Sequence, residues 1–171
     1  MVAAASPVPI VIYNIPARAG RNLGAKGMLE LAGMPNVAGV KQALPSLDAE
    51  TLEILAGAPR GFSVLGGEDT ILFPLTLMGG AGTISAAAHL CTARFVAMIE
   101  CGLAGKVDDG RTHAEALLPV VQAAFAEPNP SVFKGVLHAQ GKIPTADVRL
   151  PLVNAERASI DRALAALDAA T

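Results

Sequence analysis

The sequence predicts an α/β protein in which four β/α units form a parallel sheet and the rest of the chain is helical. Short apolar segments alternate with helical patterns over about the first 105 residues, and such alternation is typical of a parallel sheet. Hydrophobic residues make up 52% of the 171 residues and charged residues 16%, which suits a sheet largely covered on both faces and argues against disorder. We therefore expect a β/α region over residues 1–105 and a helical region over 106–171.

The predicted strands are short apolar runs bounded by glycine, proline or polar residues. They cover Val8–Tyr13, Asn36–Lys41, Phe62–Leu65 and Thr83–Ser85. The predicted helices place apolar residues at helical spacing. They cover Leu23–Ala32, Ser46 to about Gly57, Asp69–Met78 and Ala88–Leu103, then Asp109–Ala126 and two segments that follow Pro130 and Asn154.

Several local expectations accompany these helices. Ser46 is a residue type that caps helices, and Asp69 is explained as a helix-start residue rather than a general base. Leu52 is expected to face inward, as are Leu103 and Phe125 in the later helices, because each continues an apolar stripe. Four β/α units are too few to close an eightfold barrel, which needs about 250 residues. Length alone leaves open an open sheet or part of a larger barrel.

Composition also excludes several classes of protein. The net charge is −2 and no segment concentrates Lys and Arg, so we expect no nucleic-acid partner. No stretch reaches the roughly 18 apolar residues of a membrane span, and residues 1–6 lack the features of a signal peptide. Cys91 and Cys101 suit two buried thiols in a reducing cytosol. No His or Cys has the spacing of a metal site. A cytoplasmic protein without metal or cofactor is expected.

Lys41 is the strongest candidate for chemistry. It ends the second predicted strand, and functional groups of parallel β/α proteins collect at the carboxyl ends of strands. Burial there disfavours the charged ammonium, and a neutral amine can attack a ketone to form a Schiff base. The alternative is a lysine whose stem packs on the strand while its amine reaches water.

Tyr13 ends the preceding strand and is the only tyrosine. Neighbouring parallel strands lie about 4.8 Å apart, so its ring can approach Lys41, and its hydroxyl can relay protons. A strand-end tyrosine with its hydroxyl in water is the alternative. Arg18 follows in the loop after Tyr13 and can hold a carboxylate through two contacts; a solvent-facing arginine is equally compatible. Gly67 follows the third strand and can let a ligand approach the backbone, or simply make a turn.

These motifs together resemble one family. Segment Tyr13–Gly20 (YNIPARAG) resembles the YN(V/I)PxRTG segment of dihydrodipicolinate synthases, and Gly39–Lys41 (GVK) is similar to their G(I/V)K. Segments Leu65–Asp69 (LGGED) and Gly79–Ser85 (GGAGTIS) resemble their (S/G)G(D/E)D and GGxGVIS motifs. The helical tail adds Asn129, Pro130 and Lys134, which resemble NPxPxK, and Arg149–Leu152 (RLPL), which resembles LRLPL.

The family comprises class I aldolase-type enzymes that include N-acetylneuraminate lyase. The resemblance implies strands 5–8 of a (β/α)₈ barrel with a C-terminal helical extension, usually assembled as oligomers. It implies that Lys41 forms a Schiff base with pyruvate, that Tyr13 relays protons and that Arg18 binds the carboxylate of an aldehyde substrate. The backbone around Gly67 and Ile84 would line the pocket. Arg18 favours the dihydrodipicolinate synthase branch, that is, a 4-hydroxy-tetrahydrodipicolinate synthase-like lyase.

The sequence departs from the family pattern in three places and in extent. Gln42 stands in place of the usual acid, His89 in place of a frequent asparagine and Val132 in place of a proline. The first two bear on the substrate, through pocket polarity. The resemblance begins at the fifth strand, so the GTTGE loop that completes the relay and holds the carboxylate of pyruvate has no counterpart here.

A half-barrel would have open edges at its first and last strands and would lose cover from its inner face. We expect it to form a homo-oligomer, to pair with a complementary N-terminal half, or to exist as a truncated product. Two other functions remain open. One is a catalytically incomplete assembly or interaction module. The other is a small open α/β ligand-binding domain, which would carry helices on both faces of its sheet, whereas a half-barrel carries them on one.

Overall fold

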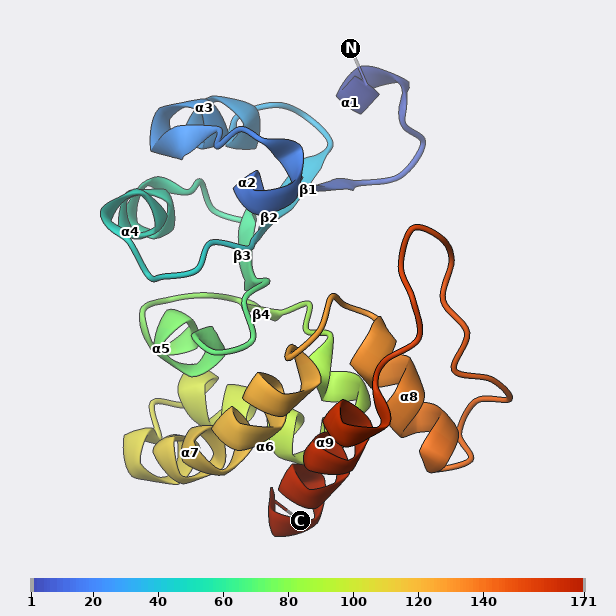
Figure 1. The fold of residues 1–171 in the computed structure, drawn as a ribbon. Coiled ribbons are helices and arrows are strands. Elements are labelled where there is room, and N and C mark those ends of the chain that lie inside the picture. The colour runs from blue at the N-terminus through green and yellow to red at the C-terminus, as the bar shows by residue number, and fades with distance from the viewer. Residues whose placement is uncertain (1, 171) are drawn as a thin grey trace. The chain divides into compact units, whose positions relative to one another are not determined.

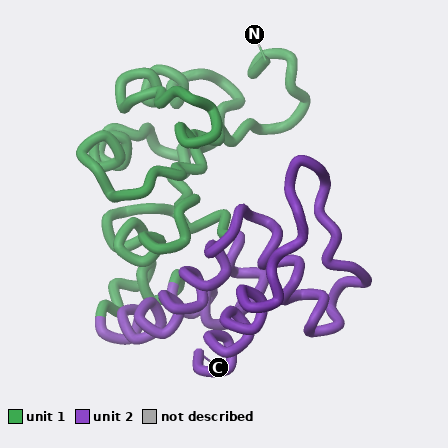
Figure 2. Tube along the Cα trace, viewed as in Figure 1, with its two compact units in different colours: residues 1–85, 99–107 green, residues 86–98, 108–171 purple. Residues whose placement is uncertain are grey.

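The computed structural model describes residues 2–170. The chain forms two compact units (Figure 2). The first unit comprises residues 1–85 and 99–107, and the second comprises residues 86–98 and 108–171. The sequence-based boundary at residue 105 remains a prediction.

The first unit is built on a parallel sheet of four strands in the order β1-β2-β3-β4 (Figure 1). The strands are β1 (Ile10–Asn14), β2 (Val37–Gln42), β3 (Ser63–Gly66) and β4 (Gly82–Thr83). All four predicted strands are therefore present, and each boundary differs from its prediction by one or two residues. Because each strand pairs with the next one along the chain, consecutive β/α units lie side by side.

One short helix precedes β1, and helices follow β1, β2 and β3. They are α1 (Val2–Ala5), α2 (Pro16–Ala19), α3 (Gly24–Ala32), α4 (Ala49–Gly57) and α5 (Leu72–Leu77). Figure 1 shows α3, α4 and α5 on the same side of the strands. A doubly wound sheet would carry helices on both sides. This one-sided arrangement is that of a partial barrel, as the sequence led us to expect.

The hydrophobic core of the first unit lies between the sheet and these helices. It contains buried residues of α3, α4, β2 and β3, namely Ala25, Met28, Val40, Ile54 and Val64. Ile12 of β1 packs against the same cluster. Side chains alternate across a strand, and the pairing register puts Ile12, Val40 and Val64 in one row. The helix-facing side of the sheet is therefore a continuous apolar layer.

Helix α4 begins later than Ser46, the predicted cap. Its N-cap is Asp48, whose carboxylate accepts a hydrogen bond of 2.8 Å from the backbone N–H of Thr51. A carboxylate in that position satisfies an open N–H group and also favours the positive end of the helix dipole. Thr51 and Ile54 are buried and Leu55 packs against the core cluster, whereas Leu52 is 37% exposed. The inward orientation predicted for Leu52 was wrong.

Asp69 also differs from its prediction as a helix-start residue. Helix α5 begins at Leu72 with Ile71 as its N-cap, so Asp69 precedes the helix. Asp69 is buried, and its carboxylate accepts a hydrogen bond from the hydroxyl of Ser85, which follows β4. The residue thus connects the segment after β3 to the segment after β4. Gly79 and Gly80 lie in the turn expected before β4, whose first residue is Gly82, and Gly79 and Gly82 have positive φ.

The second unit is helical. Helix α7 (Val107–Ala124) contributes nearly all of its length to it, and α8 (Ser131–Ala139) and α9 (Arg157–Ala170) lie wholly within it; a 3₁₀ turn, η1 (Ala87–His89), precedes α6 (Thr92–Leu103). Helices α8 and α9 pack closely, because a Cβ added at Gly135 would lie 2.5 Å from the Ile160 side chain. The predicted helical tail is present.

Two side chains predicted to face inward lie at helix ends and are largely exposed. Leu103 is the last residue of α6 and is 57% exposed. Phe125 follows α7 and is 40% exposed, although the edge of its ring contacts Phe133 with 5.0 Å between ring centroids. Helical spacing does not predict the direction of a side chain at or beyond the last residue of a helix. Both cysteines are half-buried free thiols rather than buried ones. None of the helices in residues 2–170 has the length and apolar character that spanning a bilayer requires.

Candidate active site

The side chains of Tyr13 and Lys41 meet at the carboxyl ends of β1 and β2. The two residues are direct partners in the parallel register. The Lys41 Nζ atom lies 4.1 Å from the centroid of the Tyr13 ring, which is cation–π geometry. The amine therefore rests on the face of the only tyrosine in the chain, as the adjacency of the two strand ends predicted.

Lys41 projects from the face of the sheet opposite the hydrophobic core. Its neighbour Val40 is fully buried on the helix-facing side, and successive side chains of a strand alternate. Lys41 is half-buried and Tyr13 is 51% exposed. The amine is neither enclosed in the core nor extended away from the sheet.

Gly67 supports the lysine stem from the neighbouring strand. It follows β3, and its backbone N–H donates a 2.8 Å hydrogen bond to the carbonyl oxygen of Gln42. A Cβ added at Gly67 would lie 2.8 Å from Cε of Lys41 and 2.9 Å from its Cγ. Real Cβ atoms do not approach this closely, so the lysine occupies the space that a side chain would take. Glycine is thus required here by close approach.

Ile84 continues the same edge of the sheet. It follows β4, and its N–H donates a 2.9 Å hydrogen bond to the carbonyl oxygen of Gly66. The side chain of Ile84 is 45% exposed. The segments that carry Tyr13, Lys41, Gly67 and Ile84 therefore follow one another across the carboxyl edge of the sheet. Their predicted roles in binding and catalysis remain predictions.

Arg18 lies in α2, the short helix that follows β1. Its side chain is exposed, so it can meet an anion from solvent. The helix ends at Gly20, which adopts a left-handed conformation with φ of 69° and whose N–H donates to the carbonyl oxygen of Pro16. A fixed turn after β1 thus presents the arginine next to the strand that ends in Tyr13.

Gln42 does not contribute to pocket polarity, contrary to the expectation from its unusual identity. It follows Lys41 in β2, so its side chain points to the helix-facing side of the sheet. There it is buried and donates a 3.1 Å hydrogen bond to the hydroxyl of Thr51 in α4. It also accepts a 2.9 Å hydrogen bond from Nδ2 of Asn14. The sequence reasoning missed both Asn14 and Thr51, although strand alternation is a signal that could have placed Gln42 correctly.

The two remaining departures lie in the helical unit. His89 ends η1 and is exposed. Val132, which replaces a proline of the family motif, is fully buried in α8. Within residues 2–170, no group of three or more His, Cys, Asp or Glu side chains is arranged to hold a metal ion.

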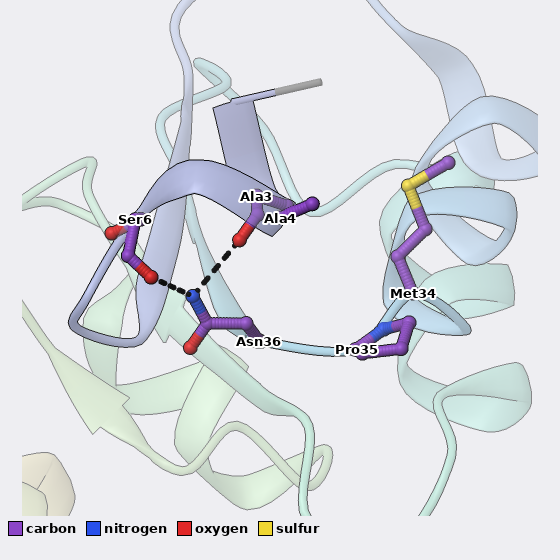
Figure 3. Close-up of a pocket in the computed structure, with 6 residues that line it drawn as sticks. All are labelled: Ala3, Ala4, Ser6, Met34, Pro35 and Asn36. Carbon is purple, nitrogen blue, oxygen red and sulfur yellow. Dashed lines mark hydrogen bonds between the residues drawn. The ribbon is translucent and has the colours of Figure 1, made fainter.

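A pocket of about 370 Å³ lies at the amino ends of the strands rather than at the carboxyl ends (Figure 3). It is lined by Ala3, Ala4, Ser6, Met34, Pro35 and Asn36. Asn36 adopts a positive φ of 69°. Its amide donates 3.0 Å hydrogen bonds to the carbonyl oxygens of Ala3, Ser6 and Val8, so its side chain holds the segment before β1 in place. The residues that line this pocket include no lysine.

Comparison with known proteins identifies the family. The model of the dihydrodipicolinate synthetase family matches residues 1–170. A 4-hydroxy-tetrahydrodipicolinate synthase of Moorella thermoacetica is 40% identical over 166 residues, which are 97% of this chain and 56% of that protein. The corresponding protein of Listeria welshimeri is 40% identical over 158 residues, which are 91% of this chain and 53% of that protein.

Solved structures agree. The dihydrodipicolinate synthase of Thermotoga maritima matches with a TM-score of 0.93 and 28% identity, covering 99% of this chain and 58% of that one. The enzyme of Acinetobacter baumannii, solved in complex with pyruvate, matches with a TM-score of 0.92 and 27% identity, covering 99% and 57%. This chain spans about half the length of the curated relatives that it matches. Its fold is a partial (β/α) barrel with a C-terminal helical extension, and the chain belongs to the dihydrodipicolinate synthetase family.

Proposed function

We propose that this chain carries a Schiff-base lyase or synthase site that acts on pyruvate and an aldehyde, in the manner of a 4-hydroxy-tetrahydrodipicolinate synthase. The observation that carries the proposal is the placement of the Lys41 amine, 4.1 Å from the Tyr13 ring centroid at the carboxyl edge of the sheet. Membership of the family supports the reaction class, since the curated relatives are named as 4-hydroxy-tetrahydrodipicolinate synthases.

The chemistry begins when the neutral amine of Lys41 attacks the ketone carbon of pyruvate. A C–N bond forms, the carbonyl oxygen takes up a proton, and the resulting carbinolamine loses water to give an iminium ion. The iminium withdraws electrons from the adjacent methyl group, which then loses a proton to give an enamine. The enamine carbon attacks the aldehyde carbon, so that a C–C bond forms and the aldehyde oxygen takes up a proton to become a hydroxyl. Water then adds to the new iminium carbon, and cleavage of the C–N bond releases the product and returns the lysine amine. In this proposal the hydroxyl of Tyr13 relays protons in these steps.

Arg18 and the strand-end backbone have complementary roles in this proposal. Arg18 is exposed in α2, the helix that follows β1, and a guanidinium can hold the carboxylate of the aldehyde substrate through two hydrogen bonds. Gly67 leaves room for the lysine stem. Ile84 and the backbone beside it border the space that the ligand would occupy.

Trapping with borohydride tests the proposal. The protein is incubated with pyruvate and sodium borohydride, which reduces the iminium to a stable amine. We expect the protein to gain the mass of pyruvate less one oxygen atom, and peptide mapping to place that mass on Lys41. Lys41→Arg keeps the positive charge and serves as the control that gains nothing. A folded wild-type protein that gains no mass on Lys41, both alone and combined with a separately expressed N-terminal half, would refute the proposal.

We propose as the second candidate that the chain acts as an assembly module, either as a homo-oligomer or with a complementary N-terminal half. Its support is the exposure of apolar side chains along the edge strands, with Val11 44%, Tyr13 51% and Ile84 45% exposed. A sheet edge that ends in unpaired backbone groups favours association.

Light scattering coupled to size-exclusion chromatography separates the two candidates. A defined oligomer, or a stoichiometric complex with a separately expressed N-terminal half, is expected. A stable monomer that also fails to bind such a half would exclude the assembly function. Trapping of pyruvate by the isolated chain and by the complex then establishes whether assembly is needed for chemistry.

A further inference from the structure

We propose that a chain of side-chain hydrogen bonds through Asn14 and Gln42 positions the Lys41–Tyr13 pair and the loop that carries Arg18 relative to one another. In this role Asn14, Gln42, Asn22 and Thr51 are positioning residues. Asn14 and Gln42 point to the face of the sheet opposite Tyr13 and Lys41. The inference rests on the function proposed above and adds to it the residues that hold its parts in place.

The hydrogen bonds form a continuous path. Nδ2 of Asn14 donates 2.9 Å to Oε1 of Gln42 and 3.0 Å to Oδ1 of Asn22. Nε2 of Gln42 donates 3.1 Å to the hydroxyl of Thr51 in α4. Nδ2 of Asn22 donates 2.6 Å to a carboxylate oxygen of Glu50, also in α4. The path therefore runs from α4 through the ends of β1 and β2 and back to α4.

Each strand-end residue of the path adjoins a residue of the site. Asn14 follows Tyr13, and Gln42 follows Lys41. The parallel register pairs Tyr13 with Lys41 and Asn14 with Gln42. Because neighbouring side chains of a strand point to opposite faces, the amide pair and the reactive pair lie back to back. Movement of one amide is transmitted to the other pair through a single residue of backbone.

The bond between Asn14 and Asn22 closes the loop that carries Arg18. Residues 15–21 leave the end of β1 through α2 and return to Asn22. Their two flanking asparagines are joined at 3.0 Å. Asn14 thus holds the arginine loop with one amide hydrogen and the lysine strand with the other.

Burial fixes the orientation of the side-chain amides in this path. Asn14, Gln42 and Thr51 are only 4%, 4% and 2% exposed, so their polar groups depend on protein partners. Asn14 uses both of its amide hydrogens, which obliges Gln42 to present its oxygen to Asn14 and its nitrogen to Thr51. A buried network that is fully satisfied fixes side-chain orientation more strongly than apolar contact does.

The first test compares the rates at which borohydride traps pyruvate as a stable adduct on Lys41. We expect Gln42→Leu, which removes both hydrogen bonds, to slow trapping about tenfold, because small misplacements of reacting groups have large kinetic effects. Gln42→Glu retains oxygens that accept from Asn14 and from the Thr51 hydroxyl, so it should stay within about threefold of wild type. Recovery in the glutamate variant would distinguish positioning from mere side-chain volume.

A matched pair of substitutions controls for stability. Thr51 and Thr76 are both buried helix threonines, and each hydroxyl makes one hydrogen bond, to Gln42 and to the carbonyl oxygen of Leu72 respectively. Thr51→Val should slow trapping about threefold, whereas Thr76→Val should leave the rate unchanged. Equal slowing in the two folded variants would overturn the inference, since it would reflect stability alone. So would wild-type trapping by Gln42→Leu.

Asn22→Ala separates the two branches of the path. It frees the Arg18 loop but leaves the bond between Asn14 and Gln42, so pyruvate trapping should stay within about twofold of wild type. Succinic semialdehyde serves as a probe aldehyde that bears a carboxylate and consumes the enamine that pyruvate forms on Lys41. The concentration of this aldehyde that halves the amount of trapped pyruvate adduct should rise about tenfold in Asn22→Ala. If the aldehyde concentration is unchanged, or if the trapping rate changes by the same factor as that concentration, the coupling to Arg18 is refuted. Absence of any adduct in wild type would instead refute the proposed function itself.

Discussion

The two faces of the sheet differ in what covers them. The helix-facing side carries Ile12, Val40 and Val64 and packs against α3 and α4. The opposite side carries Val11, Tyr13 and Lys41, of which Val11 and Tyr13 are largely exposed. One face is closed by elements of this chain, and the other bears the candidate chemistry.

This difference teaches where stability and function reside. Burial of apolar surface stabilises a fold by about 25 cal/mol per Å², and within this unit that burial is concentrated on the helix side. Reactive groups on the other face are held by strand register and close contact with glycine rather than by a core. Substitutions on the two faces should therefore separate stability from reactivity.

The largest effect on stability is expected from the closed face. Met28 of α3 is fully buried in the cluster, so Met28→Ala should lower the free energy of unfolding by about 3 kcal/mol, through lost transfer energy and a cavity. Urea unfolding measures this change. The rate of pyruvate trapping per folded molecule should be unaltered, and a loss of trapping in fully folded Met28→Ala would show that the two faces are not separable.

An intermediate effect is expected at Gly67, on the reactive face. Gly67→Ala forces its Cβ against Cε and Cγ of Lys41, and displacement of the amine from the Tyr13 ring should slow trapping about tenfold. The cost in unfolding free energy should be about 2 kcal/mol, because the lysine stem is flexible but Cβ of Ala43, 2.9 Å from the added atom, can move only with its backbone. Gly27→Ala is the comparison for stability, because its φ is not positive and, among the residues that the structure describes, the only atom near its added Cβ is Cβ of Leu23 at 4.0 Å. Unchanged trapping in Gly67→Ala would mean that the packing of the lysine stem is irrelevant.

The smallest effect is expected at Val11, on the open face. Val11 is 44% exposed, and Val11→Thr should change the free energy of unfolding by less than about 0.5 kcal/mol at low protein concentration. If the face is covered by association, the variant should instead weaken the oligomer, and its midpoint of unfolding should depend on protein concentration differently from that of wild type. A large loss of stability in a monomeric variant would contradict the assignment of Val11 to an open face.

The sheet could be predicted well from the sequence because its strands are short apolar runs between turn residues. The meeting of Tyr13 and Lys41 followed from two facts, that each ends a strand and that consecutive parallel strands pair. The close contact at Gly67 was less accessible, since a glycine after a strand is equally compatible with a plain turn. Only the coordinates reveal that the lysine stem fills its place.

Other features depended on competition among neighbouring groups. Ser46 and Asp48 are both able to cap a helix, and the carboxylate two residues later is the one used. Gln42 was assigned to the pocket by its departure from the family pattern, whereas its place in the strand turns it toward Thr51. The hydrogen bond between Asn14 and Gln42 joins residues that are 28 positions apart, and the register that pairs Tyr13 with Lys41 also pairs these two residues.

The sequential order of the strands has a consequence for how the site is assembled. Tyr13, Lys41 and Gly67 come from three consecutive β/α units, so each contact closes only a modest loop of chain. Loop closure of this kind has a small entropic cost, and topologies rich in near-neighbour contacts form quickly. The reactive pair should thus be in place as soon as the first two strands have docked, well before the helical tail is complete.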